Sequence, residues 1–209
     1  MTTPASHADF WKRKLAAFLH DSPSKALDIR DHEERAANAY VRAGLDDFIK
    51  AYDHSADHTA AAADRIPFPS RQISCRFNGV DNRFHHPLSG VAKLAPATQP
   101  LTVTDAEETE GTLQPQLSLP VEWDESQKWR AHFFAHWRLW RRNCTDNNAA
   151  LGFLPADTRL PDHTIWQHMG VVSALAATHG KPAFLKFQLG PVQDFIAAAR
   201  STRDLWSAS

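Results

Sequence analysis

The residues whose types and spacing could support chemistry begin with a vicinal pair, His20-Asp21, at the end of an apolar run. Phe18 and Leu19 precede the pair, and Pro23 follows it and would end a helix. Burying an imidazole and a carboxylate costs free energy unless a partner satisfies both, and a metal ion is the simplest such partner. In the last turn of a helix the two side chains can converge on one cation. The pair therefore predicts a metal site.

Other imidazole and carboxylate groups lie on otherwise apolar stretches, and they are His32, Asp57, Asp64 and His168. Asp57 and Asp64 are two helical turns apart, so they would share a face, and the alanines between them leave space. Such a mixed donor set suits Mn²⁺, Fe²⁺ or Ni²⁺, whereas Mg²⁺ prefers oxygen ligands alone. The ion would activate water for phosphoester hydrolysis, and Lys25 would neutralise the phosphate. Alternatively, His168 is a hydrogen-bonded core residue and Asp57 is an N-cap or a solvated charge.

A segment rich in Trp and Arg, residues 122–143, predicts a second kind of site. Its aromatic residues would form one narrow helical stripe, and they are Trp129, Phe133, Trp137 and Trp140. Arginines lie around this stripe, and aromatic rings with interleaved arginines can bind single-stranded nucleic acid. Arg138, Arg141 and Arg142 are therefore candidate nucleic-acid contacts. The alternative, which we favour, is core packing with a solvated basic edge.

The composition is that of an ordinary globular protein. Of 209 residues, 43% are apolar and 22% charged, and the net charge of -1 makes no global case for nucleic-acid binding. No apolar run approaches the roughly 20 residues that span a bilayer, and the N-terminus lacks a secretory pattern. Cys75 and Cys144 are isolated thiols, which suits a reducing compartment. We therefore expect a cytoplasmic protein with no membrane partner.

The elements expected to position these residues are mainly helical. Periodicity and caps predict helices over 8–21, 31–44, 45–65, 122–143 and 162–178, with Asp31 and Glu34 as a capping box and Asp162 as an N-cap. A break near Asp53 is expected to divide the third of these helices. Proline recurs without helical period in residues 66–122, which predicts an irregular insertion with short strands at 72–77 and 101–103. Residues 183–189 predict a strand, and residues 192–206 a helix after it.

Four separated motifs resemble the large subunit of type III-B (Cmr) CRISPR effector complexes. His20-Asp21-Ser22-Pro23-Ser24-Lys25-Ala26-Leu27, followed by residues 32–36, is similar to its opening. Residues 56–65 resemble its Ala-Asp…Asp-Arg element, and residues 157–168 resemble its closing HD helix. Residues 189–206 resemble the start of its first palm domain. The order of the motifs agrees with the family, and the stretch from 66 to 156 carries little of the resemblance.

The resemblance implies a circularly permuted HD-type helical domain at 1–180, with the insertion at 66–122. Residues 181–209 would begin an incomplete, ferredoxin-like palm domain, so the chain would be an N-terminal fragment. Carried over by motif, the metal ligands would be His20, Asp21, Asp57 and His168. Asp21 and Lys25 would be the catalytic residues. Second-tier candidates for the metal or its surroundings are His32, His163 and Asp64.

The resemblance also implies function. In this family the HD domain is associated with cleavage of single-stranded DNA, and the palm domains with synthesis of cyclic oligoadenylate. The chain contains no Gly-Gly-Asp-Asp motif, so it carries no cyclase motif, and we expect no organic cofactor. The expected partners are the other subunits and, through the complex, CRISPR RNA and target RNA. The alternatives are an inactive HD scaffold for assembly, or a free-standing HD phosphohydrolase, which the expected C-terminal strand and helix disfavour.

Overall fold

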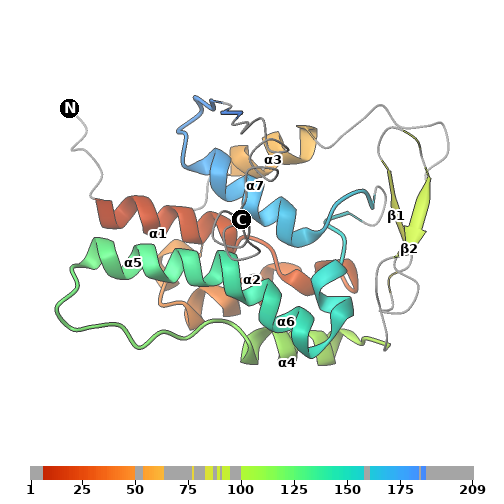
Figure 1. Cartoon of the computed structure of the whole chain (residues 1–209), viewed down its shortest axis with the longest axis horizontal. Coiled ribbons are helices and arrows are strands. Elements are labelled where there is room, and N and C mark those ends of the chain that lie inside the picture. The colour runs from red at the N-terminus through yellow and green to blue at the C-terminus, as the bar shows by residue number, and fades with distance from the viewer. Residues whose placement is uncertain are drawn as a thin grey trace, which may run out of the picture.

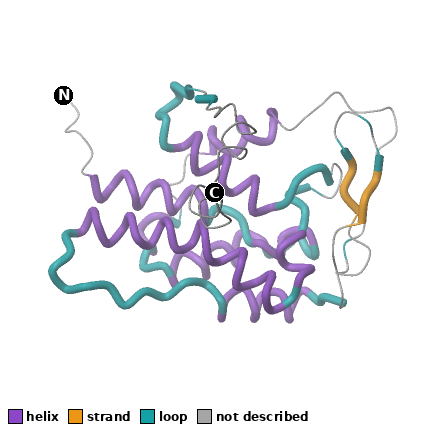
Figure 2. Tube along the Cα trace, in the orientation of Figure 1, coloured by secondary structure: helices purple, strands orange, loops and turns teal. Residues whose placement is uncertain are grey.

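The protein is mainly α-helical in its computed structural model, which describes residues 7–49, 54–63, 77, 83–86, 89, 91–94, 100–157, 161–183 and 185–186 (Figures 1 and 2). The helices are α1 (His7–Phe18), α2 (His32–Arg42), α3 (His54–Ala63), α4 (Val103–Thr112), α5 (Glu125–Ala135), α6 (Arg141–Asn147) and α7 (Ile165–Ala176). Short 3₁₀-helices span Pro23–Ala26, Asp46–Phe48 and Ala149–Phe153, and a π-helical turn spans His136–Trp140. Strands β1 (Arg83–His85) and β2 (Ala92–Leu94) pair antiparallel, with Phe84 opposite Lys93.

Helix α1 is the centre of the fold. It lies beside α5, and its C-terminal half also packs on α7 (Figure 1). Leu15, Phe18 and Leu19 are fully buried there, as the apolar run predicts. On another side, Ala17 of α1 packs with alanines of α3 and with Val172 of α7. These small side chains allow three backbones to approach closely at the end of α1, which is where the His20-Asp21 pair follows.

Helix α2 confirms the predicted element but not its predicted cap. Asp31 precedes the helix with φ -109° and ψ 20°, outside the extended region that an N-cap normally adopts, and its side chain makes no capping hydrogen bond. Gly44 ends the segment at φ +69°, a left-handed conformation that glycine adopts without steric cost. The segment predicted as a helix over 45–65, with a break near Asp53, contains a 3₁₀-helix, Asp46–Phe48, and then α3 from His54.

The prediction of an irregular insertion over 66–122 is wrong for residues 103–112, which form α4, whereas residues 115–120 have no regular structure. Thr102 is not in a strand: its hydroxyl accepts a hydrogen bond from the amide of Asp105 at 3.1 Å and caps α4. Ala106 and Glu110 of α4 are buried, so this part of the chain belongs to the helical core. The strand predicted at 72–77 lies outside the described residues except for Phe77. The strands β1 and β2 were not predicted.

The aromatic stripe is not continuous. Phe133 and Trp140 are buried as predicted, but Trp137 is 45% exposed. The π-helical turn adds a residue to the turn, so the helical phase changes between Phe133 and Trp140. Trp137, Arg138 and Leu139 consequently all face solvent.

The start of α7 is fixed by pairing with the segment before it. The amide of Ile165 donates to the carbonyl of Leu154 at 2.9 Å. Thr164 and Gln167 form a capping box, so Thr164 caps the helix in place of the predicted Asp162. Residues 183, 185 and 186 are not in a strand, and the helix predicted over 192–206 lies outside the described residues. The division into domains at residue 180 stays a prediction.

Candidate metal site

The imidazole of His20 is held with one nitrogen toward the protein backbone and the other toward carboxylates. Its side chain is buried, and Nδ1 donates a hydrogen bond to the carbonyl oxygen of Ala17 at 2.9 Å. Nε2 lies 3.3 Å from Oδ2 of Asp21 and 3.7 Å from Oδ1 of Asp57. Because the carbonyl fixes the proton on Nδ1, the neutral ring presents the lone pair of Nε2 to the carboxylates, as a metal-binding histidine does.

Asp57 and His168 approach His20 from two other helices. Asp57 lies in the first turn of α3, and His168 lies in the first turn and a half of α7. Their contact joins Oδ1 of Asp57 to Nε2 of His168 at 3.0 Å. One ligand atom from each of His20, Asp57 and His168 lies within 4.8 Å of the other two. Three segments remote in sequence thus bring two imidazoles and a carboxylate to one point.

Asp21 is buried beside this cluster and is engaged by a lysine. Oδ2 of Asp21 lies 2.7 Å from Nζ of Lys25, and this oxygen is also the one near His20. Oδ1 of Asp21 faces Nε2 of His32 at 3.9 Å, while Nδ1 of His32 donates to the carbonyl of Ile29 at 2.5 Å. Asp21 therefore links Lys25 and His32 to the cluster.

The site has a strong preference for positive charge. Burial disfavours the imidazolium of His20, but hydrogen bonds and charge from Asp21 and Asp57 outweigh burial and raise its pKa to about 9. Burial acts against ionisation of Asp21, but His20 and Lys25 hold its pKa well below its usual range. The pKa of Asp57 is likewise lowered, against burial, by His168 and His20. The two carboxylates thus stay ionised and attract a cation.

The residues present fit a divalent transition metal. The donor set of two imidazole nitrogens and a carboxylate oxygen suits Mn²⁺, Fe²⁺, Ni²⁺ or Zn²⁺ better than Mg²⁺. The lone pair of neutral His20 faces the carboxylates, so a cation can take the place of the proton that Asp21 and Asp57 stabilise on this ring. A pocket of about 470 Å³ opens beside the cluster and gives access to Asp57 and His20. Asp21 and His32 line the same pocket.

The remaining predicted residues divide between the edge of the site and other places. The ring of His163 lies 6.0 Å from that of His168, and its Nδ1 contacts Asp162 at 2.5 Å. Asp64 lies outside the described residues. Arg138, Arg141 and Arg142 do not reach the cluster and instead line a groove on another face of α7.

Sequence reasoning missed Glu110, which supports the loop after the His20-Asp21 pair. This buried carboxylate accepts a hydrogen bond from the hydroxyl of Ser22 at 2.8 Å and from the amide of Ser24 at 2.9 Å. Burial raises its pKa to about 7, against the hydrogen bonds from the two serines. Glu110 lies in an acidic stretch that is typical of a solvated helix. The only signal in the sequence is its i, i+4 spacing from Ala106, which places both on one face.

Comparison with known proteins gives two matches. A family model described as "CRISPR-associated protein Cmr2, N-terminal" matches residues 184–209. The CRISPR system Cmr subunit Cmr2 of Pyrococcus furiosus is 28% identical over 244 aligned positions, which cover 95% of this chain and 28% of that relative. The chain thus spans less than a third of that relative's length. No solved structure gives a significant match. The two matches confirm the resemblance that the motifs predict.

No helix within the described residues has the length and apolar character that a membrane span requires.

Proposed function

We infer from these two matches that the chain is similar to the N-terminal part of Cmr2, and we propose that it supplies a metal-dependent phosphodiesterase centre. The proposed centre is of the HD type and acts on single-stranded DNA within an RNA-guided type III-B complex in the cytoplasm. CRISPR RNA, target RNA and the other subunits would be partners through that complex. One observation carries the proposal: His20, Asp57 and His168 converge from separate helices within 4.8 Å of one another.

The residues around the cluster have separable roles in this proposal. His20, Asp57 and His168 would hold the cation, and a divalent ion supplies Lewis-acid chemistry for phosphodiester hydrolysis. Lys25 is paired with Asp21 at 2.7 Å, so its first role is to fix that carboxylate and to offset its charge. Asp21 in turn orients the imidazole of His20 through the 3.3 Å contact. The open pocket on this side leaves room for a phosphate.

A scaffold function is the second candidate, and the pairing of charges favours it. Protonated His20 together with Lys25 can satisfy Asp21 and Asp57 without a metal, since His20 has a pKa of about 9 in this environment. In that case the cluster is a buried ion network that joins α1, α3 and α7. The network would then fix the relative positions of α1, α3 and α7, and so the surface that neighbouring subunits contact.

Cleavage of labelled single-stranded DNA by the purified chain, with Mn²⁺ or Ni²⁺ or with EDTA, separates the two functions. The enzyme proposal expects metal-dependent cleavage that falls by about 100-fold or more in the double variant His20→Ala, Asp57→Ala. His58→Ala is the matched control, because His58 is exposed on α3. If the folded wild-type chain holds no metal by elemental analysis and cuts no DNA, the scaffold function stands and the enzyme proposal fails.

A further inference from the structure

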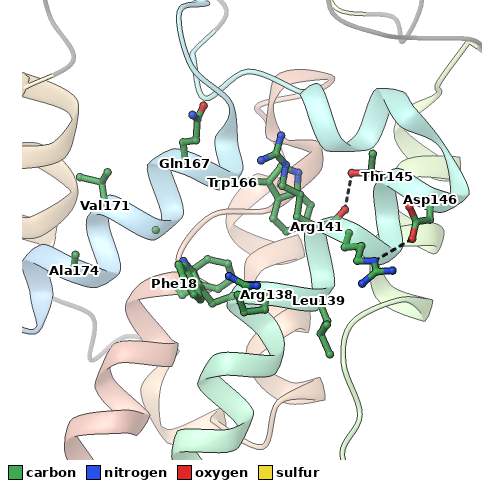
Figure 3. Close-up of a pocket in the computed structure, with 13 residues that line it drawn as sticks. Phe18, Arg138, Leu139, Arg141, Thr145, Asp146, Trp166, Gln167, Val171 and Ala174 are labelled. Carbon is green, nitrogen blue, oxygen red and sulfur yellow. Dashed lines mark hydrogen bonds and ion pairs between the residues drawn. The ribbon is translucent and has the colours of Figure 1, made fainter. Parts of the chain in front are cut away.

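A groove of about 870 Å³ runs between the outer face of α7 and the π-helical turn with α6 (Figure 3). Figure 3 shows Arg138 and Leu139 on one wall and Val171 and Ala174 on the other. Phe18 and Trp166 are also among the lining residues, although both side chains are buried beneath the surface. The metal-site residues do not line it.

The π-helical turn opens one wall of this groove to solvent. Trp137 is 45% exposed and Leu139 is 41% exposed, although the helix around them is well packed. Val171 across the groove is 44% exposed. Large apolar groups gathered on one surface are typical of a binding site, and π-helical turns are frequent at functional sites. The exposed ring of Trp137 is therefore available to stack on a flat partner.

Three arginines give the groove a positive charge. The guanidinium of Arg138 lies over the ring of Trp137, 5.6 Å from its centroid. Arg141 is held in place, because its Nε donates to the carbonyl of Gly152 at 3.2 Å. Arg142 contacts Asp146 at 3.6 Å, but both side chains are largely exposed, so this pair is weak. With one carboxylate against three guanidinium groups, the lining residues favour an anionic partner.

The opposite wall meets the tryptophan ring with a glycine, which leaves that edge of the ring free of any side chain from α7. At Gly170, a Cβ atom would lie 3.7 Å from Nε1 of Trp137, so any side chain there would cover part of the ring. Gln167 and Ala174 lie on the same outer face of α7, one helical turn either side of Gly170. His168 and Val172 face the interior instead and are buried. The groove and the candidate metal site thus lie on two faces of α7. Both include a residue of its first turn, Gln167 in the groove and His168 in the metal site.

We propose that this groove binds single-stranded DNA, with a base stacked on Trp137 and with phosphates paired to Arg138 and Arg142. The choice of DNA rests on the proposed function, because the groove runs along α7, the helix whose opposite face carries His168, and Gln167 of the groove is its neighbour in the chain. An exposed ring between arginines suits a single strand, since bases in a duplex are already stacked and paired. The charge of the groove disfavours an apolar protein segment as its occupant.

Fluorescence anisotropy with labelled dT20, in EDTA and 50 mM salt, tests binding without cleavage. We expect Arg138→Glu with Arg142→Glu to weaken binding by at least tenfold and to lower the salt dependence of log Kd by about 1 or more. Trp137→Ala should weaken binding about fivefold or more, whereas Trp137→Phe should keep most of it. The charge-matched control is Arg13→Glu with Arg130→Glu, because both residues are exposed outside the groove.

The design separates this proposal from the proposed function. His20→Ala with Asp57→Ala should bind dT20 like the wild type, so loss of cleavage leaves the groove proposal intact. Failure of the wild type to bind dT20 would overturn the groove proposal, as would an equal loss in the control pair. Tighter binding of U20 than of dT20 would overturn the assignment to DNA. Circular dichroism of each variant identifies any that fail to fold, and Gln replacement of the same arginines, which removes the charge without reversing it, then provides the measurement.

Discussion

Nε2 of His168 lies 3.0 Å from Oδ1 of Asp57, a contact between residues 111 positions apart in the chain. The contact depends on close packing of α3 against α7, which the alanines of α3 permit. Asp57 is only partly buried, so its carboxylate remains accessible from the pocket while its other contacts are internal. The pair thus links α3 to α7 at the side of the pocket, where Asp57 is accessible to solvent.

Asp57→Asn should abolish stabilisation of the folded chain by Mn²⁺. A ligand at 100 times its Kd stabilises the folded state by about 2.7 kcal/mol, and this corresponds to roughly 5–10 °C in Tm for a chain of this size. We expect such a rise for the wild type and little or none for the variant, measured by thermal melting with and without Mn²⁺. Asp47→Asn, at an exposed carboxylate, is the control. An equal rise in Tm for Asp57→Asn would show that the ion binds elsewhere.

Glu110→Gln should change how stability depends on pH. The pKa of Glu110 is raised from 4.5 to about 7, so the folded state binds a proton that the unfolded state releases. This contribution to the free energy of unfolding is fully present below about pH 4.5 and is lost as pH rises through 7, by on the order of 3 kcal/mol. Glutamine can accept from the amide of Ser24 and donate to Ser22, so the variant should lack this loss.

Urea unfolding at pH 5, 6, 7 and 8 measures the difference for Glu110→Gln. The free energy of unfolding of the wild type should fall relative to the variant as pH rises. Glu108→Gln is the matched control on the exposed side of α4. Parallel pH profiles for wild type and Glu110→Gln would contradict the raised pKa.

Trp140→Ala and Trp137→Ala should differ sharply in their effect on stability. Trp140 is fully buried, and its Nε1 donates to the carbonyl of Glu110 at 2.8 Å, so its removal should cost about 3–5 kcal/mol. Trp137 is half exposed, and its removal should cost about 1 kcal/mol or less. Urea unfolding of both variants measures the difference. Equal losses would mean that the two rings share one buried stripe after all.

Local patterns in the sequence predicted much of the fold and part of the site. The apolar run before His20 and the helical periodicity of residues 122–143 and 162–178 reflect short-range contacts, so the existence of α1, α5 and α7 followed from spacing, although the cap of α7 is Thr164 and not the predicted Asp162. His20, Asp57 and His168 were named as ligands, and the structure brings their donor atoms together. Their being ligands of a metal stays a prediction.

Other features depend on contacts that no local pattern encodes. Thr102 and the helix after it resembled a polar insertion because α4 buries only one narrow side, around Ala106 and Glu110. The exposure of Trp137 depends on a π-helical turn, whose extra residue shifts the helical phase by an amount that periodicity alone does not reveal. The pairing of Glu110 with Ser22 joins positions 88 residues apart and needs the folded core to exist.

Helices α1 to α3 precede residue 64, helices α4 to α7 follow residue 100, and α1 packs against both α5 and α7. A break of the backbone between residues 64 and 100 would therefore leave two pieces that complement each other without a covalent link. The first piece would carry His20 and Asp57, and the second would carry His168. Neither piece alone has the full donor set, so recovery of metal binding would report reassembly of the two pieces.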